Sequence, residues 1–495
     1  MQHILIIGGG LGGLFAGAIL TKEGLEVTVL EKNATAGGGL QSFTRFGEVF
    51  DTGMHVAGGL QEGASIRRLC QWLGIWDKMQ VEPMPAECID RLYFAEDRRY
   101  YQIASGRAQF VDSLSADFPH QRQHIERYVE AMYSIVDEMD LFHLRPASRT
   151  LFSHSEEFNM AADAFIAKYI TDPRLRQVAA YLNPLYGGQA DMTPAYIHAT
   201  ISVLHLGGLY RFAGGTQQFA ETLCDSIRAH GGTVVTGDPV QHIHTEGRGI
   251  TGVTTRKGRH YSADRYVSAI HPCALLPLFD DPKALPRAYR MRLQQIPSTH
   301  SAFLLYLKLK PETFPYLPYS GYYISRYDGV WSAANPFGDA AFYMTPPMPD
   351  QGAYSQKMII AAPMLWHEVS QWADTTLGHR PADYSLWKDT CAETILSKME
   401  EMYPGFRSCV SDINTASPLT IRDYYGTKDG ALFGYAKDWR NTALSLVPVV
   451  TKIPNLLLTG QCAGLHGFCG VPLTAITTCE ALLGPDSITR QLSLC

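Results

Sequence analysis

The chain has 495 residues, with 42 Lys and Arg against 48 Asp and Glu, and carries a formal net charge of −6. This length exceeds what one ordinary hydrophobic core accommodates, so we expect two domains. The excess of acidic residues argues against nucleic acid as a partner. The first residues lack the pattern of a signal peptide and no apolar run reaches about 18 residues, so we expect a cytoplasmic protein without a transmembrane helix. The ten cysteines are scattered, without the spacing of a zinc site. We therefore expect reduced thiols and no metal.

The N-terminal residues predict a complete βαβ unit. The apolar run 3–7 is typical of a buried parallel strand, and the pattern GxGxxG follows it directly at 8–13. Residues 14–24 have the apolar spacing of a helix that ends at Gly24, and 26–31 form a second strand that ends on an acidic residue. This arrangement holds the pyrophosphate of a dinucleotide at a helix N-terminus.

Each position of this unit has a specific task. Gly8 makes the tight turn, Gly10 lets the backbone approach a pyrophosphate, and Gly13 lets helix and strand pack closely. Glu31 can accept hydrogen bonds from ribose hydroxyls and would repel the 2′-phosphate of NADP. The contacts expected from this unit are Gly8, Gly10, Leu11, Gly12, Gly13 and Glu31.

A second GxGxxG, at 247–252, is a control on the first. No apolar strand leads into it and no helical pattern follows; the flanking residues alternate as in a β-hairpin. We therefore interpret these glycines as turns and predict no second dinucleotide site.

The residues after Glu31 distinguish between dinucleotides. Gly37–Gly39 form a glycine loop, and 40–50 resembles an irregular hairpin that leads to "FDTGMH", where an NAD domain would continue into another crossover helix. The combination "VLEKNxxxGG" and "FDTGMH" resembles the flavoprotein superfamily of amine oxidases, protoporphyrinogen oxidases and phytoene desaturases. The resemblance implies FAD as cofactor, with the glycine loop along its flavin side. It adds Lys32, Gly38, Gly39, Leu40 and His55 to the expected contacts.

The C-terminal segment resembles the part of this superfamily that completes the FAD site. We expect a strand at 456–458, a glycine turn, and a helix that starts near Val471 with Pro472 in its first turn. The resemblance implies that Gly460 and Gln461 meet the ribityl-phosphate region. The helix start at Gly470 and Val471 would point its positive end at the N1–C2=O edge of the flavin. The superfamily often has an acidic residue where this chain has Gln461.

A third segment contributes to the same site. We predict a helix at 217–229 and a strand at 233–237, followed by Val240. The resemblance places the backbone of Val240 at the adenine; the alternative is an ordinary core residue.

The expected fold class is therefore α/β. A Rossmann-like FAD-binding domain of the glutathione-reductase and amine-oxidase type is combined with a discontinuous α+β substrate domain. We assign 1–61, 206–285 and 420–495 to the FAD domain. The substrate domain takes 62–205, which looks mostly helical, and 286–419, which looks mixed.

The pairing of "GGGLQSF…FDTGMHVAGG" with "LTGQCAGLHGFCGV" most resembles the branch of retinol saturase, carotenoid isomerase and phytoene desaturase. Gly39 departs from the carotenoid desaturases, which commonly carry Arg there. The resemblance implies an apolar polyene or isoprenoid as substrate, with saturation, desaturation or isomerisation of its C=C or CH–CH bonds by hydride transfer at flavin N5. The electron donor stays open. The alternatives are an amine oxidase or protoporphyrinogen-oxidase type of enzyme that uses oxygen, and a non-catalytic carrier.

A reduction also needs an acid to protonate the second alkene carbon. Our candidates, in order, are Tyr186, His466 and His55, each of which has a purely structural role as its alternative. For His198 and His205 we favour the structural role. For Cys462 and Cys469 we favour a role as small apolar neighbours of the flavin.

An apolar substrate also implies access to a membrane, so we expect an association with the inner face of the cell membrane. Residues 140–152 mix apolar and basic side chains, as membrane-contacting segments do. A solvated loop is the alternative that we favour for this segment.

Overall fold

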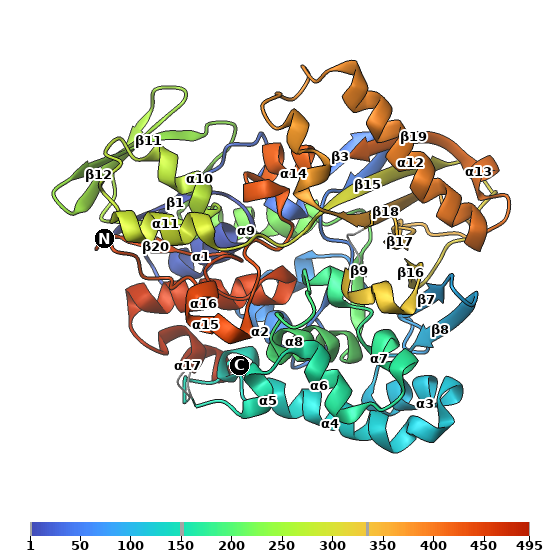
Figure 1. Ribbon diagram of the computed structural model, residues 1–495. Coiled ribbons are helices and arrows are strands. Elements are labelled where there is room, and N and C mark those ends of the chain that lie inside the picture. The colour runs from blue at the N-terminus through green and yellow to red at the C-terminus, as the bar shows by residue number, and fades with distance from the viewer. Residues whose placement is uncertain (1, 149–152, 333–335, 495) are drawn as a thin grey trace.

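A computed structural model describes residues 2–148, 153–332 and 336–494 (Figure 1). Two sheets organise it. The first has five parallel strands in the order β10-β2-β1-β14-β20. Its strands are β1 (His3–Ile7), β2 (Glu26–Leu30), β10 (Thr233–Val235), β14 (Arg265–Ser268) and β20 (Leu456–Leu458). Strands from both ends of the chain therefore lie in one sheet, and all of them fall within the segments expected to bind FAD.

Three helices pack together beside this sheet: α1 (Leu11–Lys22), α9 (Gln217–Ala229) and α16 (Gly467–Leu483). Their apolar faces and the sheet share one core, in which Leu14, Phe15, Phe219 and Leu473 are fully buried. The predicted βαβ unit and the predicted helix 217–229 are thus confirmed.

Two predictions about glycines have different outcomes. The second GxGxxG lies in an antiparallel hairpin of β11 (Val240–Glu246) and β12 (Gly249–Thr255), so the predicted hairpin is confirmed. The interpretation of its glycines as turns is right for Gly247, which has φ +61° in the turn, and wrong for Gly249 and Gly252, which lie within β12. The predicted start of the C-terminal helix near Val471 is wrong. Helix α16 begins at Gly467, and Pro472 lies inside it. Gly467 has φ +78°, which a glycine adopts without strain, so the chain enters the helix four residues earlier.

The second sheet has seven strands in the order β19-β15-β18-β17-β16-β7-β8. They are β7 (Asp90–Phe94), β8 (Arg99–Ile103), β15 (Ser301–Leu309), β16 (Ser320–Ile324), β17 (Ala340–Met344), β18 (Lys357–Met364) and β19 (Val410–Ala416). Strand β15, which lies between the edge strand β19 and β18, is buried on both faces: Phe303 packs in the core that includes α12 (Ala382–Met402), and Leu304 packs on the opposite side. The hairpin β7–β8 comes from the region 62–205, which is therefore less uniformly helical than predicted.

Helices from 107–206 cover the remaining side of the molecule, in the lower part of Figure 1. They are α3 (Arg107–Asp117), α4 (Arg122–Asp137), α5 (Glu156–Asn159), α6 (Ala162–Tyr169), α7 (Pro173–Ala179) and α8 (Ala195–Leu206). Their core continues onto β7, β8, β16 and β17. A third, small sheet joins the two parts, because β9 (Leu209–Phe212) pairs with β5 (Ala57–Gly58) and with β6 (Val81–Pro83). The domain boundaries given above stay a prediction.

Shorter elements complete the fold. They are the hairpin β3 (Ser42–Arg45) and β4 (Glu48–Asp51), β13 (His260–Tyr261), α2 (Ser65–Trp72), α10 (Pro272–Leu275), α11 (Arg287–Gln295), α13 (Phe406–Cys409), α14 (Pro418–Tyr425), α15 (Thr442–Ser445) and α17 (Ser487–Ser493). Among the described helices none combines the length and the apolar character that crossing a bilayer requires. Residues 149–152 of the proposed membrane contact lie outside the described residues.

Candidate functional site

A cavity of about 590 Å³ extends from the glycine turn after β1 to the inner face of the seven-stranded sheet. Its wall combines the three sequence segments that were expected to build one site with residues of α8, β15, β16 and β17. All the predicted cofactor contacts line it except Gly13: Gly8, Gly10, Leu11, Gly12, Glu31, Lys32, Gly38, Gly39, Leu40, His55, Val240, Gly460, Gln461, Gly470 and Val471.

The glycine turn between β1 and α1 is shaped by backbone contacts. Gly8 has φ +106°, and a Cβ on Gly13 would lie 2.0 Å from the carbonyl oxygen of Gly8. Gly13 therefore lets the helix approach the strand and does not touch the cavity. A Cβ on Gly12 would lie 2.9 Å from the Cα of Gly460, whereas a Cβ on Gly10 would find only the Cα of Gly38, at 3.9 Å. Gly10 thus leaves open backbone on the cavity side.

Glu31 lies at the end of β2 and is buried. Its Oε2 accepts a hydrogen bond from the Gly9 amide at 2.7 Å, and its Oε1 accepts one from the Asn33 amide at 2.8 Å. Each carboxylate oxygen has a second lone pair, so the side chain can still accept hydrogen bonds from a diol in the cavity. The neighbouring Lys32 points elsewhere: its ammonium donates to the carbonyl of Asp423 at 2.8 Å, and burial lowers the pKa of Lys32.

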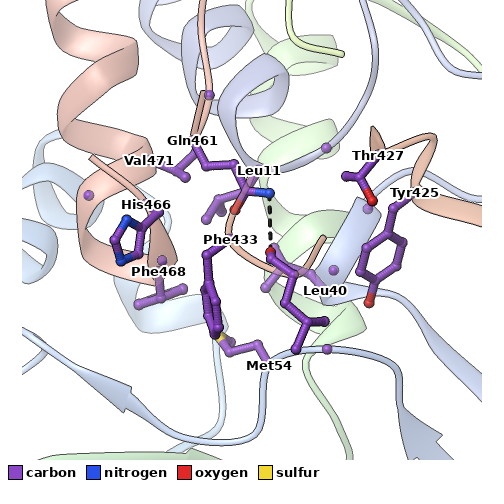
Figure 2. Close-up of a pocket in the computed structure, with 18 of the residues that line it drawn as sticks. Leu11, Leu40, Met54, Tyr425, Thr427, Phe433, Gln461, His466, Phe468 and Val471 are labelled. Atoms are coloured by element: carbon purple, nitrogen blue, oxygen red, sulfur yellow. Dashed lines mark hydrogen bonds between the residues drawn. The ribbon is translucent and has the colours of Figure 1, made fainter. Parts of the chain in front are cut away.

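The C-terminal wall is formed by Gly460, Gln461 and the start of α16. Gln461 donates a hydrogen bond to the carbonyl of Leu432 at 3.2 Å, so part of its amide is already engaged. Figure 2 shows Gln461 near Leu11 and Val471, and Phe433 projecting between His466 and Leu40. The rings of Phe433 and His466 are 5.6 Å apart.

His466 is the N-cap of α16 and is buried, and neither ring nitrogen has a hydrogen-bond partner within the described part of the chain. Burial and the nearby Lys437 lower the pKa of His466 to about 3, so the imidazole is neutral at pH 7. Lys437 is only 4% exposed, and its ammonium likewise lacks a partner among the residues that the structure describes. Burial lowers the pKa of Lys437 to about 8. A helix N-terminus beside a buried ammonium makes this corner electropositive.

His55 lies in the loop after β4, on the cavity wall. Its ring stacks on Phe342 with centroids 6.0 Å apart, and its Nδ1 is buried without a partner in the described residues. Burial lowers the pKa of His55, and the charge of Asp51 opposes this effect.

The cavity wall beyond His55 is mainly apolar. It includes Ile197, Ile201, Leu204, Ala302, Leu304 and Ala361. Histidines apart, the only charged side chains among the described lining residues are Glu31 and Lys32, and both lie at the end near the glycine turn.

Tyr186, the first candidate for the acid, is not brought to the cavity. It is buried in the helical core, where its hydroxyl pairs with His198 Nδ1 at 3.0 Å, and Tyr128 pairs with His198 Nε2 at 2.5 Å. Tyr186 is absent from the described lining residues, and burial raises its pKa well above the usual range. This prediction was therefore wrong. The structural role expected of His198 fits this arrangement.

The other candidate side chains are distributed differently. His205 lines the cavity, although its Nδ1 pairs with the carbonyl of Ile201 at 2.9 Å. Cys462 and Cys469 are buried thiols whose pKa values burial raises to about 12, which fits small apolar neighbours. Sequence reasoning missed Lys437. The signal was available: a lone lysine ends the apolar run 431–437.

Comparisons with known proteins identify the family of the chain. Residues 11–316 match the family model described as "Flavin containing amine oxidoreductase". The all-trans-retinol 13,14-reductase of Rattus norvegicus is 25% identical, over 97% of this chain and 85% of that protein. The chloroplastic prolycopene isomerase of Arabidopsis thaliana is 23% identical, over 87% of this chain and 74% of that protein.

A solved structure shows the same fold. The crystal structure of an oxidoreductase from Methanosarcina mazei superposes with a TM-score of 0.64 at 16% identity, over 97% of this chain and all of that one. The family match covers more than half of the chain. The chain therefore belongs to the family of flavin-containing amine oxidoreductases and is an FAD-dependent oxidoreductase.

Proposed function

We propose that this protein acts on a C=C bond of an apolar polyene or isoprenoid, in the direction of saturation. The observation that carries the proposal is one cavity in which the expected FAD contacts continue into an apolar wall. Among the described lining residues the only carboxylate is that of Glu31, which lies at the opposite end, near the glycine turn. The direction rests on relatives named all-trans-retinol 13,14-reductase, which align over 97% of the chain. Desaturation and isomerisation would use the same site, and the experiment below distinguishes isomerisation from saturation.

The residues present fit FAD. Glu31 would bind the adenosine ribose, and Val240 would contact the adenine. The N-terminus of α1, with Gly10 and Leu11, would bind the pyrophosphate. Gly460 and Gln461 take the ribityl chain. The start of α16 offers positive charge to the electron-rich edge of the flavin ring, and Lys437 adds its charge from behind the cavity wall, beside His466. Bound FAD supplies the two electrons as a hydride at its N5 position.

The proton that the second alkene carbon receives comes from a side chain of the protein. His55 is the better candidate for the acid, because the carboxylate of Asp51 favours its protonated form, whereas Lys437 disfavours protonation of His466. The apolar wall keeps the polyene against the reacting face and excludes water. His466 then has an orienting role toward the bound ligand, as a neutral hydrogen-bonding group at the N-terminus of α16.

We expect Gly10→Ala to weaken FAD binding about tenfold or more, which corresponds to about 1.4 kcal/mol. The added methyl group would meet protein only at 3.9 Å, so it projects into the space that a pyrophosphate would take. The FAD-free protein should lose at most about 1 kcal/mol, because alanine is the poorer N-cap. The measurement is FAD affinity from quenching of flavin fluorescence, with thermal unfolding in parallel.

Gly249→Ala is the matched control, because it changes a glycine of the second GxGxxG. Its methyl group would meet Asn455 at 3.5 Å, an ordinary contact, and FAD affinity should not change. Unaltered affinity in Gly10→Ala, or an equal loss in both variants, would contradict the assigned pyrophosphate contact.

The function itself is tested by photoreducing the holoenzyme without oxygen and adding all-trans-retinol. Saturation predicts that the oxidised flavin spectrum returns as the polyene absorption shortens. If the absorption bands of the polyene shift while the flavin stays reduced, the reaction is an isomerisation and not a saturation. If the reduced flavin is not reoxidised by any polyene but is reoxidised at once in air, the proposal is wrong and the protein is an oxygen-using oxidase.

The nonpolar substrate suggests that the protein collects it at a bilayer surface. The described part of 140–152 gives this idea little support, because Leu144 is buried and Phe142 lines the cavity. Flotation with anionic lipid vesicles tests the association; protein that stays at the bottom of the gradient would refute it.

A further inference from the structure

A group of buried polar side chains lies behind the far wall of the cavity and has no part in the chemistry above. We call it the polar cluster: Asp90, Tyr181, Arg211, Ser320 and Tyr322. Asp90 and Ser320 are register partners on the parallel strands β7 and β16, and Tyr322 follows two residues along β16, so its side chain is on the same face as that of Ser320. Asp90 and Ser320 are 0% exposed and Arg211 is 2% exposed.

The hydrogen bonds within the polar cluster are incomplete. Tyr181 donates to Asp90 Oδ2 at 2.7 Å, and Arg211 Nη1 donates to the carbonyl of Leu317 at 2.8 Å. Five other buried atoms have no partner among the described residues: Asp90 Oδ1, Arg211 Nε, Arg211 Nη2, Ser320 Oγ and the Tyr322 hydroxyl. Each buried polar atom left without a partner costs about 1–3 kcal/mol. The arrangement is thus one that a ligand with a hydrogen-bonding group would complete.

Two tyrosines connect the polar cluster to the cavity, because Tyr181 and Tyr322 are lining residues. The aromatic rings form a continuous series along this wall. His55 stacks on Phe342 at 6.0 Å, Phe342 meets Tyr322 edge-on at 5.4 Å, and Tyr322 meets Tyr181 edge-on at 5.2 Å. A long molecule that lies against this series has one end near the proposed acid and the other at the polar cluster.

The charges of the polar cluster favour a neutral group. Burial raises the pKa of Asp90 to about 7, and the hydrogen bond from Tyr181 and the charge of Arg211 oppose this rise. With a pKa of about 7, Asp90 is present in both its ionised and its protonated form at neutral pH, and its ionised form balances the charge of the guanidinium. In both forms the two side chains together offer an acceptor and donors. A hydroxyl group, which donates and accepts, satisfies both; a hydrocarbon end satisfies neither.

We propose that the polar cluster binds the terminal hydroxyl group of the substrate, so that the substrate is an isoprenoid alcohol and not a hydrocarbon carotenoid. This inference rests on the proposed function and narrows its substrate class. Tyr322 makes the contact from the cavity wall, and Asp90 and Arg211 orient it. Binding of the hydroxyl end fixes which double bond lies over the reacting face.

The test compares an alcohol with its hydrocarbon counterpart in the holoenzyme. The probes are all-trans-retinol and its deoxy analogue, in which hydrogen replaces the hydroxyl group. We expect the wild type to bind the alcohol about tenfold more tightly or better, since an unsatisfied polar site discriminates by at least 1.4 kcal/mol. Tyr322→Phe keeps the ring and removes the hydroxyl, and should abolish most of this preference through weaker alcohol binding.

Tyr323→Phe is the matched control. It makes the same change one residue along β16, where the hydroxyl donates to Glu401 at 3.3 Å, and it should keep the preference. Equal affinity for the two probes in the wild type, or an unchanged preference in Tyr322→Phe, would overturn the inference. Transfer of electrons from reduced flavin is measured separately. Two probes that bind equally and both react would leave the proposed function intact, whereas selective alcohol binding without reaction would refute the proposed function alone.

Discussion

His55→Gln is expected to slow the reduction of a polyene by photoreduced enzyme about 10²–10⁴-fold, the usual contribution of a positioned general acid. The glutamine keeps a polar side chain against Phe342, on which the histidine ring now stacks at 6.0 Å. FAD content should change little, because His55 is only one of the expected cofactor contacts and the others stay in place. Stopped-flow absorbance of the flavin, under saturating polyene, measures the loss as a change in rate and not in affinity.

The pH profile separates an acid from a structural residue. Burial lowers the pKa of His55 from its ordinary value of 6.5, so its protonated form is depleted as pH rises through the lowered pKa. The wild-type rate should therefore fall as pH increases through this region, and the fall should vanish in His55→Gln.

His205→Gln serves as the control on this prediction. It makes the same change at a second histidine of the cavity wall, whose Nδ1 already pairs with the carbonyl of Ile201. We expect its rate to stay within a few-fold of the wild type, with the pH profile retained. Comparable losses in both variants, or a pH-dependent rate that persists in His55→Gln, would remove His55 from the role.

The nucleotide end of the site could be predicted because its causes are local. Gly8, Gly13 and Glu31 are separated by few residues, and each has one steric or hydrogen-bonding task that the pattern itself specifies. A Cβ on Gly13 would lie 2.0 Å from the Gly8 carbonyl oxygen, so no other residue fits there. The second GxGxxG could be rejected on equally local grounds.

The substrate end depends on contacts between distant residues. Asp90 and Ser320 are register partners across 230 positions, and no local pattern identifies a partner so far away. Tyr186 shares its neighbourhood in sequence with cavity-lining Leu185, but its hydroxyl turns to His198 in the core. The sequence identified the right segment and could not determine the direction of the side chain.

The start of α16 shows a different limit. Pro472 is a favourable residue in the first turn of a helix, and on that ground the start was expected near Val471. The structure begins the helix at Gly467 and tolerates the proline inside it. This difference moves His466 to the N-cap, next to Lys437, and so changes the electrostatics of the site.

Lys437→Met is expected to stabilise the FAD-free protein at pH 7 by about 3 kcal/mol, because about 2.5 pKa units correspond to that free energy. Burial lowers the pKa of Lys437 from 10.5 to about 8, and its ammonium has no hydrogen-bond partner in the described residues. The folded protein thus disfavours the charged form. Methionine has a similar length and needs no partner.

The sign of the pH dependence follows from linkage. Between pH 8 and 10.5 the unfolded chain binds a proton at Lys437 that the folded chain does not, so wild-type stability rises with pH in this window. The advantage of Lys437→Met is complete below pH 8 and disappears as pH rises through 10.5. Urea unfolding of the FAD-free proteins at pH 7 and pH 10 measures it. Lys388→Met is the control: burial also lowers the pKa of Lys388, but its ammonium donates to the carbonyl of Thr415, so the replacement removes a hydrogen bond and should stabilise the protein less than Lys437→Met does.

FAD should reduce this difference, because the electron-rich flavin edge would interact favourably with the charge of Lys437, which is close to His466 but is not itself among the described lining residues. Added FAD is therefore expected to raise the thermal unfolding midpoint of the wild type more than that of Lys437→Met. The reduction potential of the bound flavin should be lower in the variant, since a nearby positive charge stabilises the reduced, electron-rich ring. An equal FAD-induced shift together with an unchanged potential would show that the charge of Lys437 does not act on the cofactor.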